Sequence, residues 1–246
     1  MTHPPWKTDM DLTRADWTDK DMADFLAYLG SLSKGEEKAK WEQRILNTAL
    51  PCLAVPAPEV KRIVKQIAKG NFRAFIRRWC WANYTASAVL GQLICHLPFA
   101  EQVELLPRYA ERTDTWAGTD CLTFDKGTPE AYLPYAQRWI ASPHTFVRRL
   151  GVIVMLKVLS TDTADKILNT LPSLQDETEY YVNMAVAWLV ADCFVKCRDK
   201  AIRFLEAGRY NDFVARKAVS KCRDSYRVSA EDKQMLLRYR KKRKDC

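Results

Sequence analysis

The pattern of apolar and polar positions predicts a helical protein. Apolar runs such as VIVMLKVL at 152–159 lie inside longer segments of helix length, and no stretch alternates strictly between apolar and polar residues as a half-buried strand does. Glycine is scarce, with 8 residues in 246. At this length, with 48% hydrophobic residues, the chain can bury one continuous core. We therefore expect an all-α fold.

Helix-stop and helix-start residues place the predicted elements. Prolines at 58 and 129 suit first turns, glycines at 35, 70 and 208 suit helix ends, and Asp114 suits the N-cap of a helix that starts at 116. The helices are predicted near residues 19–32, 36–48, 58–69, 71–80, 84–97, 99–110, 116–125, 129–141, 144–159, 163–170, 178–195, 198–207, 211–223 and 230–242.

A sequence motif recurs among these helices. An aromatic residue followed by a small or apolar run occurs in YTASAVL at 84, WAGTDCL at 116, FVRRLGV at 146, YVNMAVA at 181 and FVARKAV at 213. The motifs begin 30 to 35 residues apart in the sequence. Repeats of this length, each made of one pair of helices, predict a HEAT-like α-solenoid of about six to seven helix pairs. We expect a single repeat domain over 1–235 and a basic C-terminal tail over 236–246.

Equivalent positions of stacked repeats become neighbours in space, which singles out four residues. The fifth residue of the motif is Asp120 in WAGTDCL, whereas the other four motifs have Ala88, Leu150, Ala185 and Lys217 at this position. Residues on one helix face lie three, four and seven positions apart. The predicted surface patch therefore contains Trp116, Asp120, Arg149 and Trp188.

Each of these residues also has a purely structural interpretation. Trp188 is as readily a core residue as a surface one, and Asp120 suits a surface acid or a charge near a helix start. Arg149 suits a structural salt bridge with Asp120. The functional interpretation rests on the conjunction of two indoles, one carboxylate and one guanidinium.

Charge points to a polyanionic partner. Lys and Arg number 39 against 30 Asp and Glu, a net charge of +9, and part of the excess lies in RYRKKRKDC at 238–246. The N-terminus lacks the apolar core of a signal peptide, and no apolar run is long enough for a membrane span, so we expect an intracellular protein with no membrane partner. The scattered cysteines and histidines indicate neither a disulfide scaffold nor a metal site.

A carboxylate between aromatic faces suits a cationic ligand or transition state. On a basic surface, such a site suits DNA that carries a positively charged lesion. N-alkylated purines are lesions of this kind. Their glycosidic bond breaks toward an oxocarbenium ion, which one carboxylate can stabilise while it orients a water molecule.

Several segments together resemble the AlkD-type DNA alkylation repair glycosylases over nearly the whole chain. They are AVPAPEVKRIVKQIAKG at 54–70, DTWAGTD at 114–120, PHTFVRRLGVIVMLK at 143–157, YYVNMAVAWLVAD at 180–192 and DFVARKAVSKCRDSYRVS at 212–229. The resemblance implies that Asp120 is the catalytic carboxylate, that Trp116 and Trp188 are aromatic contacts, and that Arg149 belongs to the same site.

The resemblance also implies an activity. It is monofunctional excision of 3-methyladenine or 7-methylguanine from duplex DNA, without a metal or other cofactor and with the lesion left in the base stack. We expect a cytoplasmic, nucleoid-associated monomer. Besides Arg149, the residues expected to contact DNA phosphates adjoin the predicted concave helices: Arg148, Arg216, Lys217, Lys221, Arg223 and Arg227.

Two alternative functions remain open. Asn183 and Met184 occupy the part of the 181 motif where the resemblance implies a lysine, which favours a DNA-binding paralogue without glycosylase activity. The other alternative is a protein-binding HEAT scaffold, a common use of such solenoids, against which the net charge argues.

Overall fold

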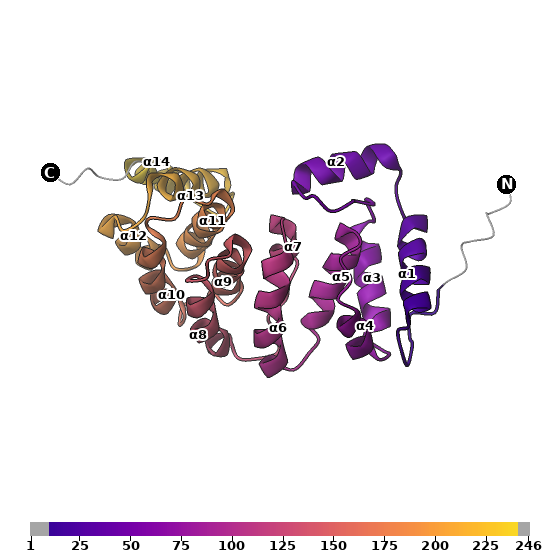
Figure 1. Ribbon diagram of the computed structural model, residues 1–246. Helices are drawn as coiled ribbons and strands as arrows, with labels where there is room; N and C mark the ends of the chain where they lie inside the picture. Colours follow the sequence, from indigo (N-terminus) through magenta and orange to yellow (C-terminus); the bar gives the residue numbers. More distant parts are fainter. Residues whose placement is uncertain (1–9, 241–246) are drawn as a thin grey trace. The chain divides into compact units, whose positions relative to one another are not determined.

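The computed structural model describes residues 10–240, which form helices and contain no strand (Figure 1). The helices are α1 (Asp19–Ser31), α2 (Glu36–Leu46), α3 (Ala57–Ile67), α4 (Phe72–Arg78), α5 (Tyr84–Ile94), α6 (Phe99–Arg112), α7 (Trp116–Asp120), α8 (Pro129–Trp139), α9 (Thr145–Lys157), α10 (Ala164–Thr170), α11 (Tyr180–Lys196), α12 (Arg198–Ala207), α13 (Asp212–Asp224) and α14 (Ala230–Leu236). Two short 3-10 helices cover Leu171–Leu174 and Leu237–Tyr239. The predicted all-α class, built from successive short helices, is confirmed.

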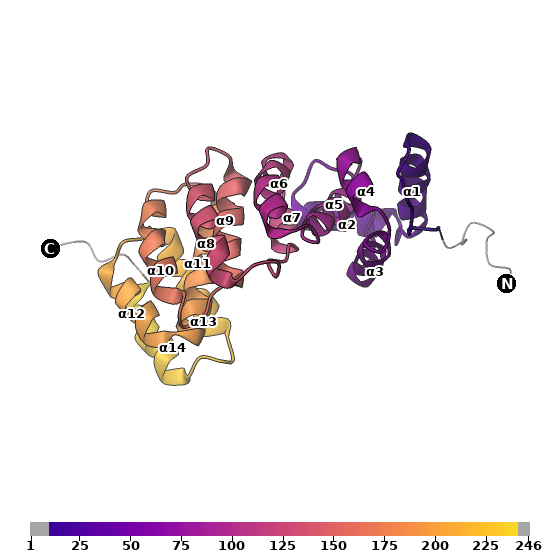
Figure 2. The same cartoon turned by 90° about the horizontal axis from the view of Figure 1, so that it is seen from below.

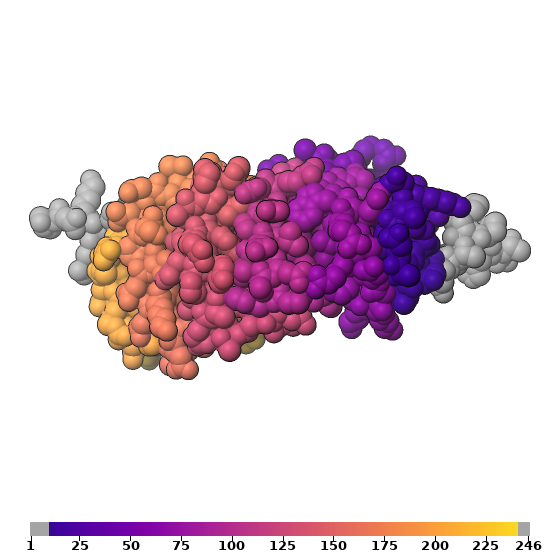
Figure 3. All heavy atoms as spheres, turned by 60° about the horizontal axis from the view of Figure 1, so that its bottom comes forward, coloured from indigo at the N-terminus to yellow at the C-terminus, as the bar shows by residue number. Residues whose placement is uncertain are grey.

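The helices form two compact units, Met1–Lys126 and Gly127–Cys246. The N-terminal unit contains α1 to α7 and the C-terminal unit contains α8 to α14. Within each unit the colour changes gradually from helix to helix in Figure 3, because segments that follow one another in the sequence are also neighbours in space. This local connectivity is typical of helical repeat proteins.

In the N-terminal unit, α5 is the central helix. Nearly all of its side chains are buried, because α1, α3, α4, α6 and α7 all pack against it. The neighbouring α3 is amphipathic instead, with its apolar residues at helical spacing on the buried face: Val60, Ile63, Val64 and Ile67. The difference follows from sequence, since α3 alternates these residues with Lys and Glu whereas α5 carries no charge.

In the C-terminal unit, α9, α11 and α13 lie side by side, with α8 against α9 and α12 against both α11 and α10 (Figure 2). The approach of α8 to α9 depends on Gly151, where a β-carbon would lie 2.7 Å from Cγ2 of Ile140 and 2.8 Å from the carbonyl oxygen of Ala136. The stacking of second helices that the repeat predicts is thus present within this unit.

The aromatic residue of each motif lies in the first turn of α5, α7, α9, α11 and α13, as its position in the repeat predicts. The clearest difference from the predicted elements is α7, which ends at Asp120 rather than near 125. The chain leaves the helix because Leu122 turns into the core and the backbone N–H of Thr123 bonds to Sγ of Cys95 at 3.4 Å.

The C-terminal end also differs from the predicted 230–242 helix. The α-helix ends at Leu236, and the 3-10 turn that follows buries Tyr239 against the unit. Of the predicted basic tail, residues 241–246 lie outside the described part of the chain. Over residues 10–240, no helix is both long enough and apolar enough to span a membrane.

Candidate functional site

The short helix that carries Trp116 and Asp120 is held in place at its N-terminus. Thr115 is the N-cap, and its hydroxyl accepts a hydrogen bond from the N–H of Ala117 at 3.4 Å and donates one to the carbonyl oxygen of Leu46 at 2.7 Å. Asp114 is therefore not the N-cap predicted from the sequence. A helix of only five residues does not persist alone, so these contacts with the end of α2 define its position.

Asp114 has a different structural role. One of its carboxylate oxygens accepts a hydrogen bond from the hydroxyl of Thr48 at 2.6 Å, and the other accepts one from the backbone N–H of Ala49 at 2.6 Å. These bonds join the segment before α7 to the segment that follows α2. The carboxylate therefore bonds to a loop and does not cap a helix. Local capping rules do not predict these bonds, because the two donors lie about 65 residues away in the sequence.

Trp116 is half-buried in the first turn of α7. Its indole Nε1 donates a hydrogen bond to the carbonyl oxygen of Ile45 at 3.3 Å, and its ring packs against a cluster of Leu46, Cys52 and Ala117. The side chain thus bridges α7 and the C-terminal end of α2. Its ring position is determined by packing and by the one hydrogen bond that an indole can donate.

Asp120 is half-buried at the other end of the same helix, four residues after Trp116 and on the same face. The hydroxyl oxygen of the buried Thr119 lies 3.2 Å from Oδ1 of Asp120 and 2.9 Å from the carbonyl oxygen of Trp116. Gly118 lets α7 pack closely, since a β-carbon there would lie 2.3 Å from the hydroxyl oxygen of Thr113. The WAGTD sequence therefore positions an indole and a carboxylate together.

Sequence reasoning did not assign a role to Tyr84, the aromatic residue of the first motif. Its ring packs beside Trp116 on the same cluster. Burial raises the pKa of its hydroxyl, and electrostatic interactions with Cys121, Glu42, Cys52 and Asp120 raise it further. Burial, followed by Glu42, likewise raises the pKa of Cys52 to about 12. Both groups are therefore neutral at neutral pH.

In the C-terminal unit, Trp188 lies at the surface rather than in the core, with 38% of its area exposed. The ammonium of Lys221, from α13, lies 5.9 Å from the centre of its ring, within the range of a cation–π contact. The two helices therefore present an indole face and a cation at one place on the surface.

Arg149 is buried, with 4% of its area exposed. Its guanidinium donates a hydrogen bond to the carbonyl oxygen of Tyr181, so it connects α9 to the first turn of α11. This contact belongs to the packing of the two helices. A role for Arg149 toward DNA stays a prediction.

Arg148, the adjacent residue, forms a structural ion pair. Its Nε lies 2.7 Å from Oε2 of Glu177, and its guanidinium also donates to the carbonyl oxygens of Ser142 and Pro143. Burial opposes ionisation of Glu177, but bonds from Arg148 and from the N–H of Glu179 outweigh it and lower its pKa. With only 16% of its side chain exposed, Arg148 mainly stabilises the start of α9.

The remaining predicted phosphate contacts gather on α13 and the loop after it. Lys221 is half-buried beside Trp188, and the others are exposed: Arg216, Lys217, Arg223 and Arg227. Lys217 lies over the ring of Phe213 at 5.9 Å, four residues from Lys221 along one face of the helix. This side of α13 therefore combines cations with aromatic rings, a composition typical of nucleic-acid-binding surfaces.

Asn183, expected to mark a lost positive charge, is buried instead. Its Nδ2 donates to the carbonyl oxygen of Glu177 at 2.9 Å, and its Oδ1 accepts from Nδ2 of Asn211, the N-cap of α13, at 2.8 Å. Asn183 thus connects the starts of α11 and α13. A charged side chain here would have to be buried, so this position contributes no surface charge of its own.

The predicted patch draws on both units. Trp116 and Asp120 lie together in the N-terminal unit, whereas Arg149 and Trp188 belong to the C-terminal unit. Within its own unit each has the placement described above. The convergence of all four side chains stays a prediction that rests on the repeat.

Comparison with known proteins identifies the family. The family described as DNA alkylation repair enzyme matches residues 27–222, which include α7 and the helices α9, α11 and most of α13. No curated protein matches the chain. Since the match covers most of the sequence and includes the indole and carboxylate of α7, the chain belongs to the DNA alkylation repair enzyme family.

Proposed function

We propose that the protein is a monofunctional DNA glycosylase that removes cationic N-alkylated purines, such as 3-methyladenine and 7-methylguanine, from duplex DNA. The observation that carries this proposal is the arrangement of Trp116 and Asp120 on one face of α7. An indole face and a carboxylate on a rigid five-residue helix form a compact site for positive charge.

The chemistry suits this site because an alkylated purine is already a good leaving group. The bond between C1′ of the deoxyribose and the purine nitrogen breaks, its electron pair moves to the base, and the cationic base leaves as a neutral molecule. Positive charge then develops on the sugar. The carboxylate of Asp120 stabilises this charge and orients a water molecule, whose oxygen bonds to C1′ while its proton passes to solvent.

The surroundings of Asp120 support this role. The hydroxyl of Thr119 contacts the carboxylate, the close packing at Gly118 fixes the helix that carries it, and the neutral Tyr84 lies near enough to interact with it. Preorganised charge in such a setting is more effective than the same charge in water, because it needs no reorganisation during the reaction.

DNA binding is assigned to the C-terminal unit. The exposed cations of α13, together with Lys221 and Trp188, supply phosphate contacts and an aromatic surface. Arg149 and Arg148 support the surface by fixing the start of α9 against α11 and the preceding loop. The active form in this proposal is a monomer that acts on the alkylated duplex.

The test is release of free base from N-methylated duplex DNA. The proposal predicts 7-methylguanine in the soluble fraction and abasic sites that remain unbroken until alkali is added, since a monofunctional enzyme does not cleave the strand. Duplex binding without release would instead identify a DNA-binding paralogue. In that case the α7 site would read DNA without reacting with it.

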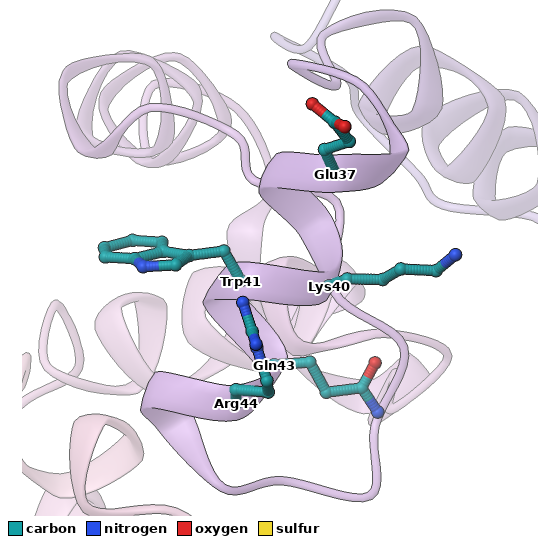
Figure 4. Close-up of a pocket in the computed structure, with 5 residues that line it drawn as sticks. All are labelled: Glu37, Lys40, Trp41, Gln43 and Arg44. Carbon is teal, nitrogen blue, oxygen red and sulfur yellow. The ribbon is translucent and has the colours of Figure 1, made fainter.

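A second function, protein binding, is favoured by one specific feature of α2. Trp41 and Ile45, one turn apart, are 58% and 52% exposed, and Trp41 with Lys40 and Arg44 lines an open surface pocket of about 730 Å³ (Figure 4). Exposed apolar residues of this size often mark protein interfaces. Trp41→Ala should leave the Kd for duplex DNA unchanged if α2 serves a protein partner, whereas a higher Kd would assign α2 to the DNA surface.

A further inference from the structure

The C-terminal end of α2 is capped by residues from the start of α7. The carbonyl oxygens of Ile45 and Leu46 lie in the last turn of α2, where a helix has no further N–H groups of its own to bond them. Nε1 of Trp116 donates to the first oxygen at 3.3 Å, and the hydroxyl of Thr115 donates to the second at 2.7 Å. The same bonds therefore complete the end of α2 and fix the first turn of α7.

Asp114 continues this set of bonds beyond the end of α2. After the helix the chain turns through Thr48 and Ala49, and both residues donate to the carboxylate of Asp114 at 2.6 Å. The buried hydroxyl of Thr48 also accepts a hydrogen bond from the N–H of Leu50 at 3.1 Å. Three consecutive residues, 114 to 116, thus bond in order to successively earlier residues at the end of α2. We call this set of bonds the α2–α7 junction.

Helix α2 makes few contacts with the other helices. Leu46 is its one buried side chain, and α2 packs extensively against no other helix within residues 10–240. It lies crosswise to α1 and α3 in Figure 1. The carboxylate of Glu42 accepts a hydrogen bond from the N–H of Ala54 at 2.7 Å, but this bond joins α2 only to the loop that leads to α3. The α2–α7 junction therefore fixes α2 against the helix that carries Trp116 and Asp120.

We propose that Asp114 is a positioning residue for the Trp116–Asp120 pair, because it fixes the register of the α2–α7 junction on which both side chains depend. A helix of five residues does not hold two functional side chains in place by itself. The inference rests on the proposed function in taking base release as the reaction. It goes further in giving a part in that reaction to an acid whose carboxylate is bonded within the protein.

Two substitutions of Asp114 separate its geometric effect from the effect of its charge, which any acid near the site would have. Asn keeps the shape of the side chain and an oxygen that accepts from Ala49. Its amide can donate to the hydroxyl oxygen of Thr48, which has two acceptor sites and uses one of them for Leu50. Positioning therefore predicts that Asp114→Asn retains most of the function and that Asp114→Ala, which has no acceptor, does not.

Asn71 offers a matched control in the same unit. Its Nδ2 donates to the carbonyl oxygen of Ala15 at 2.9 Å, and its Oδ1 accepts from the N–H of Ala74 at 3.2 Å. Asn71→Ala therefore also removes two hydrogen bonds, one of them to a segment 56 residues away, but neither bond involves α2 or α7. General destabilisation should affect both alanine variants alike, whereas loss of positioning should affect Asp114→Ala alone.

The experiment measures single-turnover release of 7-methylguanine from methylated duplex DNA, together with the Kd for the undamaged duplex by fluorescence anisotropy. We expect Asp114→Ala to lower the rate constant of release by about tenfold or more and to leave the Kd within about twofold of wild type, because small displacements of reacting groups slow chemistry more than binding. Asp114→Asn should stay within about threefold of wild type in both. Thr48→Val removes one of the two donors, so it should have a smaller effect and add little to Asp114→Ala.

A second readout does not depend on base release. The indole N–H of Trp116 gives an NMR signal that Trp116→Phe identifies, and its exchange with solvent reports the hydrogen bond to Ile45. We expect this signal to shift and to exchange faster in Asp114→Ala, and to stay unchanged in Asn71→Ala. If the wild-type protein releases no base, the proposed function fails, and the indole signal decides the positioning role alone.

Four results would overturn the inference. An unchanged indole signal in Asp114→Ala would do so, and so would release by this variant at the wild-type rate from an active protein. Equal loss of release in Asp114→Ala and Asn71→Ala would assign the effect to stability, and equal loss in Asp114→Ala and Asp114→Asn would assign it to charge. Should Asp114→Ala not fold, judged by circular dichroism, Thr48→Val takes its place in each comparison.

Discussion

The indole nitrogen of Trp116 donates its hydrogen bond to the carbonyl oxygen of Ile45, at 3.3 Å, across the junction of α7 and α2. An indole has only one N–H, so this bond is made at the expense of any hydrogen bond from Trp116 to DNA. Trp116 therefore acts toward a ligand through its ring face. The same bond ties the position of the ring to the end of α2.

Substitution of Trp116 separates the contribution of the ring from that of its hydrogen bond. Trp116→Phe keeps an aromatic face and loses the bond to Ile45, so it should lower the free energy of unfolding by about 1 kcal/mol and retain most base release. Trp116→Ala removes the face and should lower release by tenfold or more. Chemical denaturation and single-turnover release of 7-methylguanine measure the two effects, and equal release by both variants would exclude a role for the ring face.

Gly118 is required for packing rather than for flexibility. A β-carbon at this position would overlap the side chain of Thr113, so Gly118→Ala should destabilise the protein by about 1–3 kcal/mol and displace α7. Gly30→Ala is the control, because no atom lies within 4 Å of a β-carbon in that exposed turn of α1. It should be neutral or slightly stabilising. Urea denaturation compares them, and a Gly118→Ala variant as stable as Gly30→Ala would contradict the packing of α7.

The Arg148–Glu177 pair predicts a pH dependence of stability. Interactions in the folded protein lower the pKa of Glu177 below its ordinary value of 4.5, so the pair stabilises the fold while the carboxyl is ionised in both states. This contribution is present above the unfolded pKa and is lost as pH falls through the folded one. Glu177→Gln should therefore be less stable than wild type at pH 7, and the difference should shrink below about pH 4. A difference that is constant from pH 7 to pH 3 would show that ionisation is not its source.

The cations of α13 should affect binding without affecting stability. Lys217 is exposed on α13, and Lys166 is a matched exposed lysine on α10. Lys217→Gln should weaken duplex binding at low salt and reduce the slope of log K against log salt by about one, whereas Lys166→Gln should change neither. Anisotropy titrations over a salt series measure both. Identical slopes for the two variants would remove this face of α13 from the DNA surface.

Much of the fold follows from local sequence. Helix starts at Pro129 and Asn83, and the amphipathic period of α3, depend on neighbouring residues alone, which is why the predicted elements agree with the structure. The position of the motif aromatics in the first turn has the same origin. Helix α7 was predicted too long because Cys121–Phe124 continues the apolar pattern, while its termination depends on a distant partner, Cys95.

The candidate site was less predictable, because it too depends on contacts between residues that are far apart in the sequence. The Trp-x-x-x-Asp spacing was visible in the sequence, but the contacts of Asp114 with Thr48 and of Asp192 with Arg227 join residues far apart in the chain. Burial of Arg149 and Asn183 likewise depends on tertiary neighbours.

The central claim is that Asp120 performs the chemistry, and one measurement tests it most directly. It compares release of 7-methylguanine from methylated duplex DNA by wild type, Asp120→Asn and Asp125→Asn, with duplex binding recorded in parallel. Asp125 is an exposed acid five residues away, so its variant carries the same charge change. We expect Asp120→Asn to lose release by about a hundredfold or more while it binds DNA like wild type, and Asp125→Asn to remain active. Release by Asp120→Asn at the wild-type rate would contradict the account.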